Sequence, residues 1–217
     1  MPTFEAVLGH PYYKQLLDWD DECISPDLVT ISDSLQEGTL VICSDGYFQP
    51  TAGKGSHGWV FSTLNGKILW KGAGPACGHS DLMSAYRAKL SGLISILYII
   101  NYVIYQQSIA NGLATVYCDN TSALVEVFSK PYCSPNPYRQ LQSDIDLITC
   151  SRYLLKALPP DITLQHCWIK SHYKGPSKHL EHNFNELADS IAGSYNDTPH
   201  PESIQAPIAH PTSTIEV

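Results

Sequence analysis

The chain has 217 residues, of which 43% are hydrophobic, and this length and composition are sufficient for one well-packed domain with extensions. Its seven cysteines include no Cys-x-x-Cys pair, which argues against a zinc site and a disulfide framework and in favour of a reducing compartment. The net charge of −8 does not exclude a nucleic-acid partner, because residues 1–38 carry a net −7 and 197–217 a net −3, whereas 39–196 carry twelve basic and ten acidic side chains.

Residues 1–38 are expected to form an acidic N-terminal extension, with a short helix around 12–18 followed by mixed polar segments. The first residues lack a basic start and an apolar run, so no signal peptide is predicted. We therefore expect an intracellular protein, cytoplasmic or nuclear, that is not secreted.

The next segment predicts three strands and a long helix. The strands are expected at 40–48, 55–64 and 66–74, and the dipeptide Asn65-Gly66 between the last two is typical of a type I′ hairpin. Ser80 or Asp81 is expected to cap a helix that runs to about Gln107. Its apolar part, 93–105, is short for a membrane span, so we interpret it as a core helix and expect no membrane partner.

The remainder predicts two further strands separated by helices. A fourth strand is expected at 114–120, a short helix capped by Asn120 or Thr121 runs through Phe128, and Pro131, Pro135 and Pro137 indicate a loop. The other expected elements are a helix at 138–158, a strand at 162–173, a helix at 183–195 and a proline-rich, disordered tail at 197–217. This order predicts an α/β fold: a five-stranded mixed sheet, formed by an antiparallel meander and then βαβ crossovers, flanked by helices.

Three aspartates have settings that suggest one site. Asp45 ends the first strand, Asp119 ends the fourth, and Asp189 lies in the last helix. Ligands of open α/β sheets bind outside the carboxyl ends of the strands, so Asp45 and Asp119 could meet if their strands are neighbours. Clustered carboxylates suit Mg²⁺ or Mn²⁺, and two such ions can support an in-line phosphoryl displacement. Each aspartate alone is also compatible with a turn, a helix cap or a solvated helix face.

The motifs SDGYF, SAYRA-x-L, YCDN, IKSHYKG and NELAD, in this order, resemble the ribonuclease H domain, most closely the domains attached to reverse transcriptases of retroelements. The resemblance covers roughly 39–195. It implies a ribonuclease H-like domain at 39–196 that cuts the RNA strand of RNA–DNA hybrids with two Mg²⁺ or Mn²⁺ ions. It also implies a possible reverse transcriptase partner, and we expect a monomer.

Carried over by position, the resemblance makes Asp45, Asp119 and Asp189 metal ligands. His172 matches a histidine that helps protonation and product release. The expected nucleic-acid contacts are Gly46, Asn120, Lys170, Lys174 and Lys178, and an ordinary solvated surface remains the alternative for the lysines.

One position departs from the family pattern. The pattern resembles Tyr-Arg-Ala-Glu-Leu, and this chain has Lys89 where the family has the fourth carboxylate. A lysine there would remove a metal ligand and repel metal ions, and its ammonium could pair with Asp45 and Asp119 in place of a cation. We therefore expect weak or absent Mg²⁺-dependent cleavage.

Two other functions stay open at the level of the sequence. One is a non-catalytic module that keeps the fold and binds nucleic acid or serves as a scaffold. The other is transposase or integrase chemistry, which uses a related fold but usually takes its last acid as a glutamate, whereas NELAD supplies Asp189.

Overall fold

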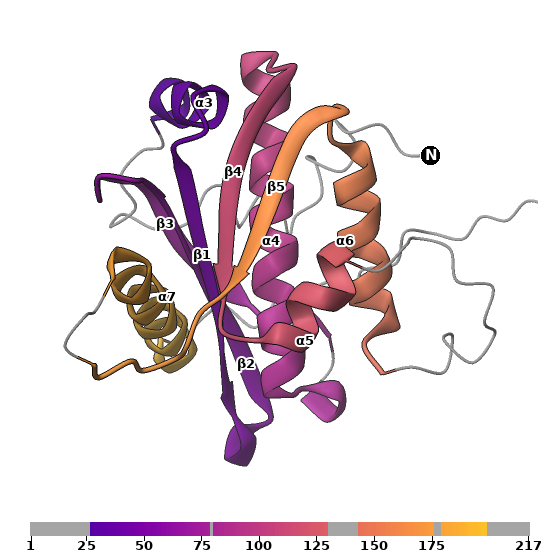
Figure 1. The fold of residues 1–217 in the computed structure, drawn as a ribbon. Coiled ribbons are helices and arrows are strands. Elements are labelled where there is room, and N and C mark those ends of the chain that lie inside the picture. Colours follow the sequence, from indigo (N-terminus) through magenta and orange to yellow (C-terminus); the bar gives the residue numbers. More distant parts are fainter. Residues whose placement is uncertain (1–26, 79, 130–142, 176–178, 199–217) are drawn as a thin grey trace, which may run out of the picture.

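The computed structural model describes residues 27–78, 80–129, 143–175 and 179–198 (Figure 1). Its centre is a five-stranded sheet in the order β3-β2-β1-β4-β5. The strands are β1 (Leu40–Gln49), β2 (Lys54–Thr63), β3 (Ile68–Pro75), β4 (Asn111–Cys118) and β5 (Asp161–Trp168). The first three pair antiparallel, and β4 pairs parallel with both β1 and β5. The predicted meander followed by crossovers is confirmed.

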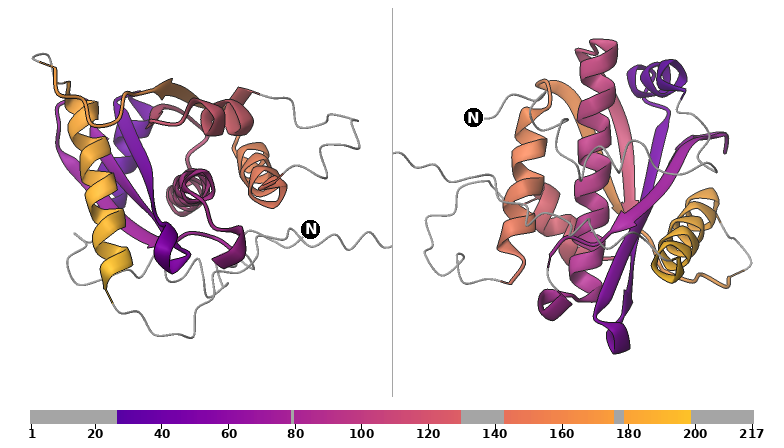
Figure 2. Two further views of the ribbon diagram at one scale, coloured as in Figure 1. Left: turned by 90° about the horizontal axis from the view of Figure 1, so that it is seen from below. Right: turned by 180° about the vertical axis from the view of Figure 1, so that it is seen from behind.

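Helices cover both faces of this sheet (Figures 1 and 2). One face carries α7 (Leu180–Asp197), and the other carries α4 (Ala85–Gln107), α5 (Thr121–Leu124) and α6 (Ile145–Ala157). A π-helical turn, Val125–Ser129, continues α5, and two short 3₁₀ helices lie at Pro50–Ala52 and Ser80–Leu82. The expected helix at 12–18, the prolines at 131–137, the start of the helix expected at 138–158 and nearly all of the tail lie outside the described residues.

Strand β1 is buried on both faces, which explains its continuous apolar run. Leu40 and Ile42 belong to the core beneath α4, whereas Val41 and Cys43 pack with Phe184 of α7. Successive side chains of a strand point to opposite faces, so a central strand between two helical layers needs apolar residues at every position. The same alternation continues along the strand, so that Gly46 faces α4 and Asp45 lies on the side of α7.

Helix α4 is the core helix that the sequence predicts. It is long and apolar enough to cross a membrane by length and composition, yet most of its residues are buried against the sheet and α6. Ser84 caps it by accepting a hydrogen bond from the backbone N–H of Arg87. The expected caps, Ser80 and Asp81, lie instead in the 3₁₀ turn that precedes the helix.

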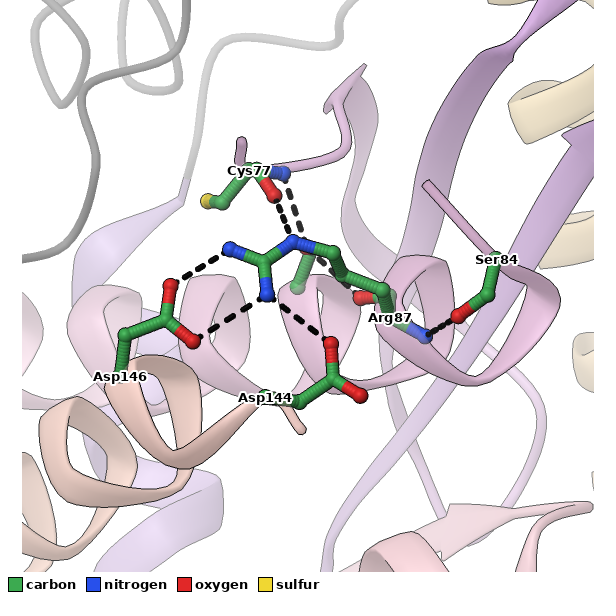
Figure 3. A network of polar contacts seen from close by, with 6 residues as sticks. Cys77, Ser84, Arg87, Asp144 and Asp146 are labelled. Carbon is green, nitrogen blue, oxygen red and sulfur yellow. Dashed lines mark hydrogen bonds and ion pairs between the residues drawn. The ribbon is translucent and has the colours of Figure 1, made fainter. Parts of the chain in front are cut away.

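Arg87 links the first turn of α4 to the start of α6 by ion pairs (Figure 3). Its guanidinium is almost fully buried, donates to Asp144 at 2.9 Å and to Asp146 at 2.5 Å, and reaches the carbonyl oxygen of Cys77 at 2.5 Å. A planar guanidinium suits such multiple pairing, and its single positive charge is shared by the carboxylates of Asp144 and Asp146 at the start of α6. The register of α4, and with it the position of Lys89 two residues later, is therefore fixed by this network.

Two other expectations differ in detail from the structure. The β2–β3 connection spans residues 64–67, and only Gly66 is left-handed (φ 94°), so it is a hairpin but not a type I′ turn. A register shift at Phe61/Ser62 accompanies the longer connection. Strand β5 ends at Trp168 rather than at 173, because its partner β4 ends at the paired residue Cys118, and the chain then turns at His172, whose φ is 47°.

The first described helix, α3 (Leu28–Gln36), falls where mixed polar segments were expected. Asp27 caps it, and Ile31 and Leu35 are buried in the main core against α4 and β4. Leu28, Ile31 and Leu35 recur at helical spacing, a pattern that the sequence-based expectation did not use, and packing against α4 and β4 stabilises the helix. The domain boundary expected at residue 39 remains a prediction.

A buried histidine on β2 makes stability depend on pH. His57 is fully buried, its Nε2 lies 3.1 Å from Ser95 Oγ, and burial lowers its pKa to about 3. Because the unfolded chain takes up this proton near pH 6.5 and the folded chain does not, stability is lost as pH falls. The free energy of unfolding should drop by about 2 kcal/mol between pH 7.5 and 5.

Urea unfolding at these two pH values measures the effect. In a His57→Gln protein, which keeps a polar side chain toward Ser95 but cannot titrate, the drop should be largely absent. An equal drop in both proteins would contradict the assignment to His57.

Candidate functional site

The parallel pairing of β1 and β4 brings two aspartates to the same edge of the sheet. Cys43 pairs with Tyr117, so Asp45 and Asp119 are the next matching positions, two residues further along each strand. Asp45 is 4% exposed, and Asp119 lies one residue after the end of β4. The predicted meeting of Asp45 and Asp119 is therefore present, but Asp45 does not end its strand: β1 continues to Gln49 through its pairing with β2, and only the pairing with β4 stops before Asp45.

Lys89 bridges these two carboxylates from α4. Its Nζ atom lies 2.5 Å from Asp45 Oδ1 and 2.5 Å from Asp119 Oδ1. The Lys89 side chain is 15% exposed, and the two aspartate side chains are 5% and 10% exposed, so water screens the three charges poorly. The lysine that departs from the family pattern thus lies between two of the predicted metal ligands.

Glycine at position 46 makes this contact possible. A Cβ atom there would lie 2.4 Å from the backbone nitrogen of Lys89 and 2.5 Å from the carbonyl carbon of Ala88. Helix α4 therefore lies directly on the backbone of β1, and the Gly46 N–H donates to Asp45 Oδ1 at 2.7 Å. Gly46 was expected to contact nucleic acid, and the structure gives it a packing role.

This packing predicts a strong effect of a single methyl group. Gly46→Ala should lower the free energy of unfolding by about 3 kcal/mol, because backbone atoms cannot move aside as a flexible side chain can. Gly193→Ala is the matched control, since its Cβ would meet only the Tyr47 ring at 3.8 Å and it lies within a helix. The control should be as stable as the parent or up to about 1 kcal/mol more stable. Denaturant unfolding of a Gly46→Ala protein with parental stability would contradict the close packing.

Asn185 of α7 is a fourth member of the site that the sequence analysis missed. Its Nδ2 donates to Asp45 Oδ2 at 3.0 Å, and the side chain is 3% exposed. Its Oδ1 is buried with no hydrogen-bond partner among the described residues. The signal was present in the motif NELAD, because Asn185 precedes Asp189 by one helical turn and shares its face.

The electrostatics of the site favour an ionised bridge. Burial lowers the pKa of Lys89, but the carboxylates of Asp45 and Asp119 outweigh it and raise the pKa above its ordinary value, so the ammonium form dominates. Burial raises the pKa of Asp45, and the Lys89 ammonium opposes part of that rise. Two carboxylates and one ammonium leave a net charge near −1.

Such an arrangement does not fit a pair of divalent ions. The ammonium lies between the two oxygens that would ligate them, and a further cation about 4 Å away would be repelled by roughly 4 kcal/mol per unit charge at an effective dielectric of 20. Within the described residues, no group of three or more His, Cys, Asp or Glu side chains is placed to hold a metal ion.

Asp189 lies near the site but is not bonded to it. The residue before it, Ala188, packs its carbonyl oxygen on Gly58, and Gly58 is the cross-strand partner of Asp45. Asp189 is half-buried, one turn along α7 from Asn185. Its proposed part as a metal ligand therefore stays a prediction.

The other predicted contact residues are more scattered. Asn120 caps α5 by accepting the Ala123 N–H at 2.9 Å, so its side chain already has a structural partner. Lys170, His172 and Lys174 are exposed on the segment that follows β5. Lys178 lies outside the described residues.

Trp168 is a second residue that sequence reasoning did not select. It ends β5, is 55% exposed, and donates its Nε1–H to the backbone oxygen of Asp119 at 2.9 Å. The signal available in the sequence was an aromatic residue at the predicted carboxyl-terminal part of a strand, two positions before Lys170.

No family model matches the chain, and no curated protein matches it. Solved structures do. LC11-RNase H1, isolated from compost by a metagenomic approach, is 15% identical, with a TM-score of 0.51 over 74% of this chain and 96% of that one. The same protein in complex with an RNA/DNA hybrid gives 14% identity and a TM-score of 0.52 over 73% and 96%. RNase H1 from the archaeon Halobacterium salinarum NRC-1 gives 17% identity and a TM-score of 0.47 over 73% and 97%. The sheet order and the similarity to the two LC11-RNase H1 structures show a ribonuclease H-like fold.

Proposed function

We propose that this protein is a ribonuclease H-like module that binds RNA–DNA hybrids and cleaves them weakly or not at all with Mg²⁺. The observation that carries the proposal is the position of Lys89 Nζ, 2.5 Å from a carboxylate oxygen of both Asp45 and Asp119. In a two-metal hydrolase, the ions stabilise the attacking and leaving oxygens. A single ammonium, already paired with two carboxylates, offers no site for an activated water and no free positive charge, so this site does not hydrolyse a phosphodiester and the attraction of phosphates must come from other residues.

Hybrid binding is the substrate class that the fold supports best. LC11-RNase H1, which has a similar fold, was solved with an RNA/DNA hybrid. In this chain the acidic residues concentrate outside 39–196, and Lys170 and Lys174 are exposed beyond β5. Phosphate contacts by such lysines predict binding that weakens as salt concentration rises.

An active ribonuclease H is the second candidate, favoured by the meeting of Asp45 and Asp119 at one edge of the sheet. It requires Lys89 to leave the bridge so that Mg²⁺ or Mn²⁺ can enter. The retroelement origin and a reverse transcriptase partner remain parts of the proposal that rest on the motif resemblance.

One experiment separates the two candidates. A labelled RNA–DNA hybrid is incubated with the parent and with Asp119→Asn, in Mg²⁺, in Mn²⁺ and in EDTA, and binding and cleavage are both measured. We expect salt-sensitive binding that persists in EDTA, with no cleavage by either protein. Cleavage by the parent that Asp119→Asn abolishes would establish the enzyme instead, and absence of hybrid binding would reject both.

A further inference from the structure

Trp168 presents an aromatic surface to solvent beside the Lys89 bridge. It is 55% exposed, whereas Trp59 and Trp70 are 0% and 2% exposed in the core. Tryptophan is enriched at contact surfaces because its ring is apolar and its N–H is polar, and here both parts are in use or available.

The ring is held in place although it is exposed. Its Nε1–H donates to the backbone oxygen of Asp119, and the carboxylate of the same residue receives the Lys89 ammonium. Trp168 is therefore one residue removed from the ammonium and loses little side-chain freedom when a ligand covers it.

A second aromatic position lies two residues earlier on the same edge strand. His166 is exposed, and its ring stacks on Phe128 with centroids 5.2 Å apart and an interplanar angle of 9°. Residues two apart share one face of a strand, about 6.6 Å from each other. The exposed cations Lys170 and Lys174 follow Trp168 along the chain.

Exposed aromatic rings on one face of a strand, followed along the chain by exposed lysines, are the kinds of side chain by which proteins hold single-stranded nucleic acid. We propose that Trp168 stacks an unpaired nucleobase, and that the adjoining phosphates meet Lys170 and Lys174. The inference rests on the proposed function in that it assigns a ligand contact to the same nucleic-acid site. The base can belong to a free single strand or to an overhang at the end of a hybrid.

The test uses the full chain and three ligands: a single-stranded oligonucleotide, a blunt RNA–DNA hybrid and the same hybrid with a single-stranded overhang. Binding is followed by fluorescence anisotropy, and tryptophan emission is recorded in parallel. The single strand and the overhang should quench emission, and Trp168→Phe should remove that quenching. Trp168→Ala should weaken binding of these two ligands about tenfold or more, whereas Trp168→Phe, which keeps a stacking ring, should stay within about threefold.

Tyr105→Ala is the matched control, an exposed aromatic near the end of α4, and it should bind all three ligands as the parent does. Parental binding and quenching in Trp168→Ala would overturn the inference while hybrid binding stands. Equal losses of binding affinity in Trp168→Phe and Trp168→Ala would also overturn the inference, because the hydrogen bond to Asp119, which both variants lack, would then be the important contact. Single-strand binding with quenching but no hybrid binding would support the inference and reject the proposed function, and binding of no ligand would reject both.

Discussion

Replacing Lys89 by glutamate should convert the protein into a Mg²⁺-dependent nuclease acting on RNA–DNA hybrids, with cleavage at least about 100-fold above the parent. The substitution removes the ammonium between Asp45 and Asp119 and adds a third carboxylate at the same point. A repulsion of roughly 4 kcal/mol per unit charge disappears, which corresponds to about a thousandfold in metal affinity for each unit of charge on the ion, before the new ligand is counted. Cleavage of a labelled hybrid at several Mg²⁺ concentrations measures the change.

Two controls make this result interpretable. Lys89→Met removes the repulsion without adding a ligand and should gain much less activity, and Asp119→Asn should abolish whatever Lys89→Glu gains. Mg²⁺ should also raise the thermal unfolding midpoint of Lys89→Glu and leave that of the parent unchanged, because ligands that bind only the folded state stabilise it. A Lys89→Glu protein that neither cleaves nor responds to Mg²⁺ would contradict the interpretation of the site.

Removing the charge of Lys89 should also destabilise the fold. In Lys89→Met, the carboxylates of Asp45 and Asp119 stay in poorly hydrated positions with no cation between them. Breaking a buried ion pair from one side typically costs about 3–5 kcal/mol, and we expect a loss of about 3 kcal/mol in the free energy of unfolding at pH 7.5 because the bridge is partly exposed. Denaturant titration measures this loss.

The pH dependence of this stability loss tests whether the unpaired carboxylates cause it. Burial already raises the pKa of Asp45, so acidification to pH 4.5 should protonate Asp45 more readily in Lys89→Met than in the parent. The difference in free energy of unfolding between the two proteins should therefore be smaller at pH 4.5 than at pH 7.5. Adding Asp45→Asn to Lys89→Met should recover part of the stability at pH 7.5, because it removes one of the two repelling charges. Lys54→Met, at an exposed lysine, should change stability by no more than about 0.5 kcal/mol. A loss below about 1 kcal/mol in Lys89→Met would contradict a bridging role.

Much of the architecture follows from local sequence. The continuous apolar run of β1, the core helix α4 and the crossovers around β4 have patterns that only a sheet buried on both faces satisfies. The expectations that were wrong concern the boundaries of elements. Ser84 rather than Ser80 caps α4, and α3 forms because Ile31 and Leu35 pack into the main core. Such outcomes depend on partners distant in the sequence, which local propensity does not contain.

For the site, the sequence by itself determined which residue types were available: an aspartate after each of two apolar strand runs, an aspartate in the last helix and a lysine in place of an acid. Only the tertiary structure decided how they combine, because a salt bridge needs three atoms within a few ångströms and residue spacing does not specify such distances. The approach of α4 to Gly46 placed Lys89 between Asp45 and Asp119. Asn185 and Trp168 joined them through contacts with residues 140 and 49 positions away in the chain, and no local pattern marks such partners.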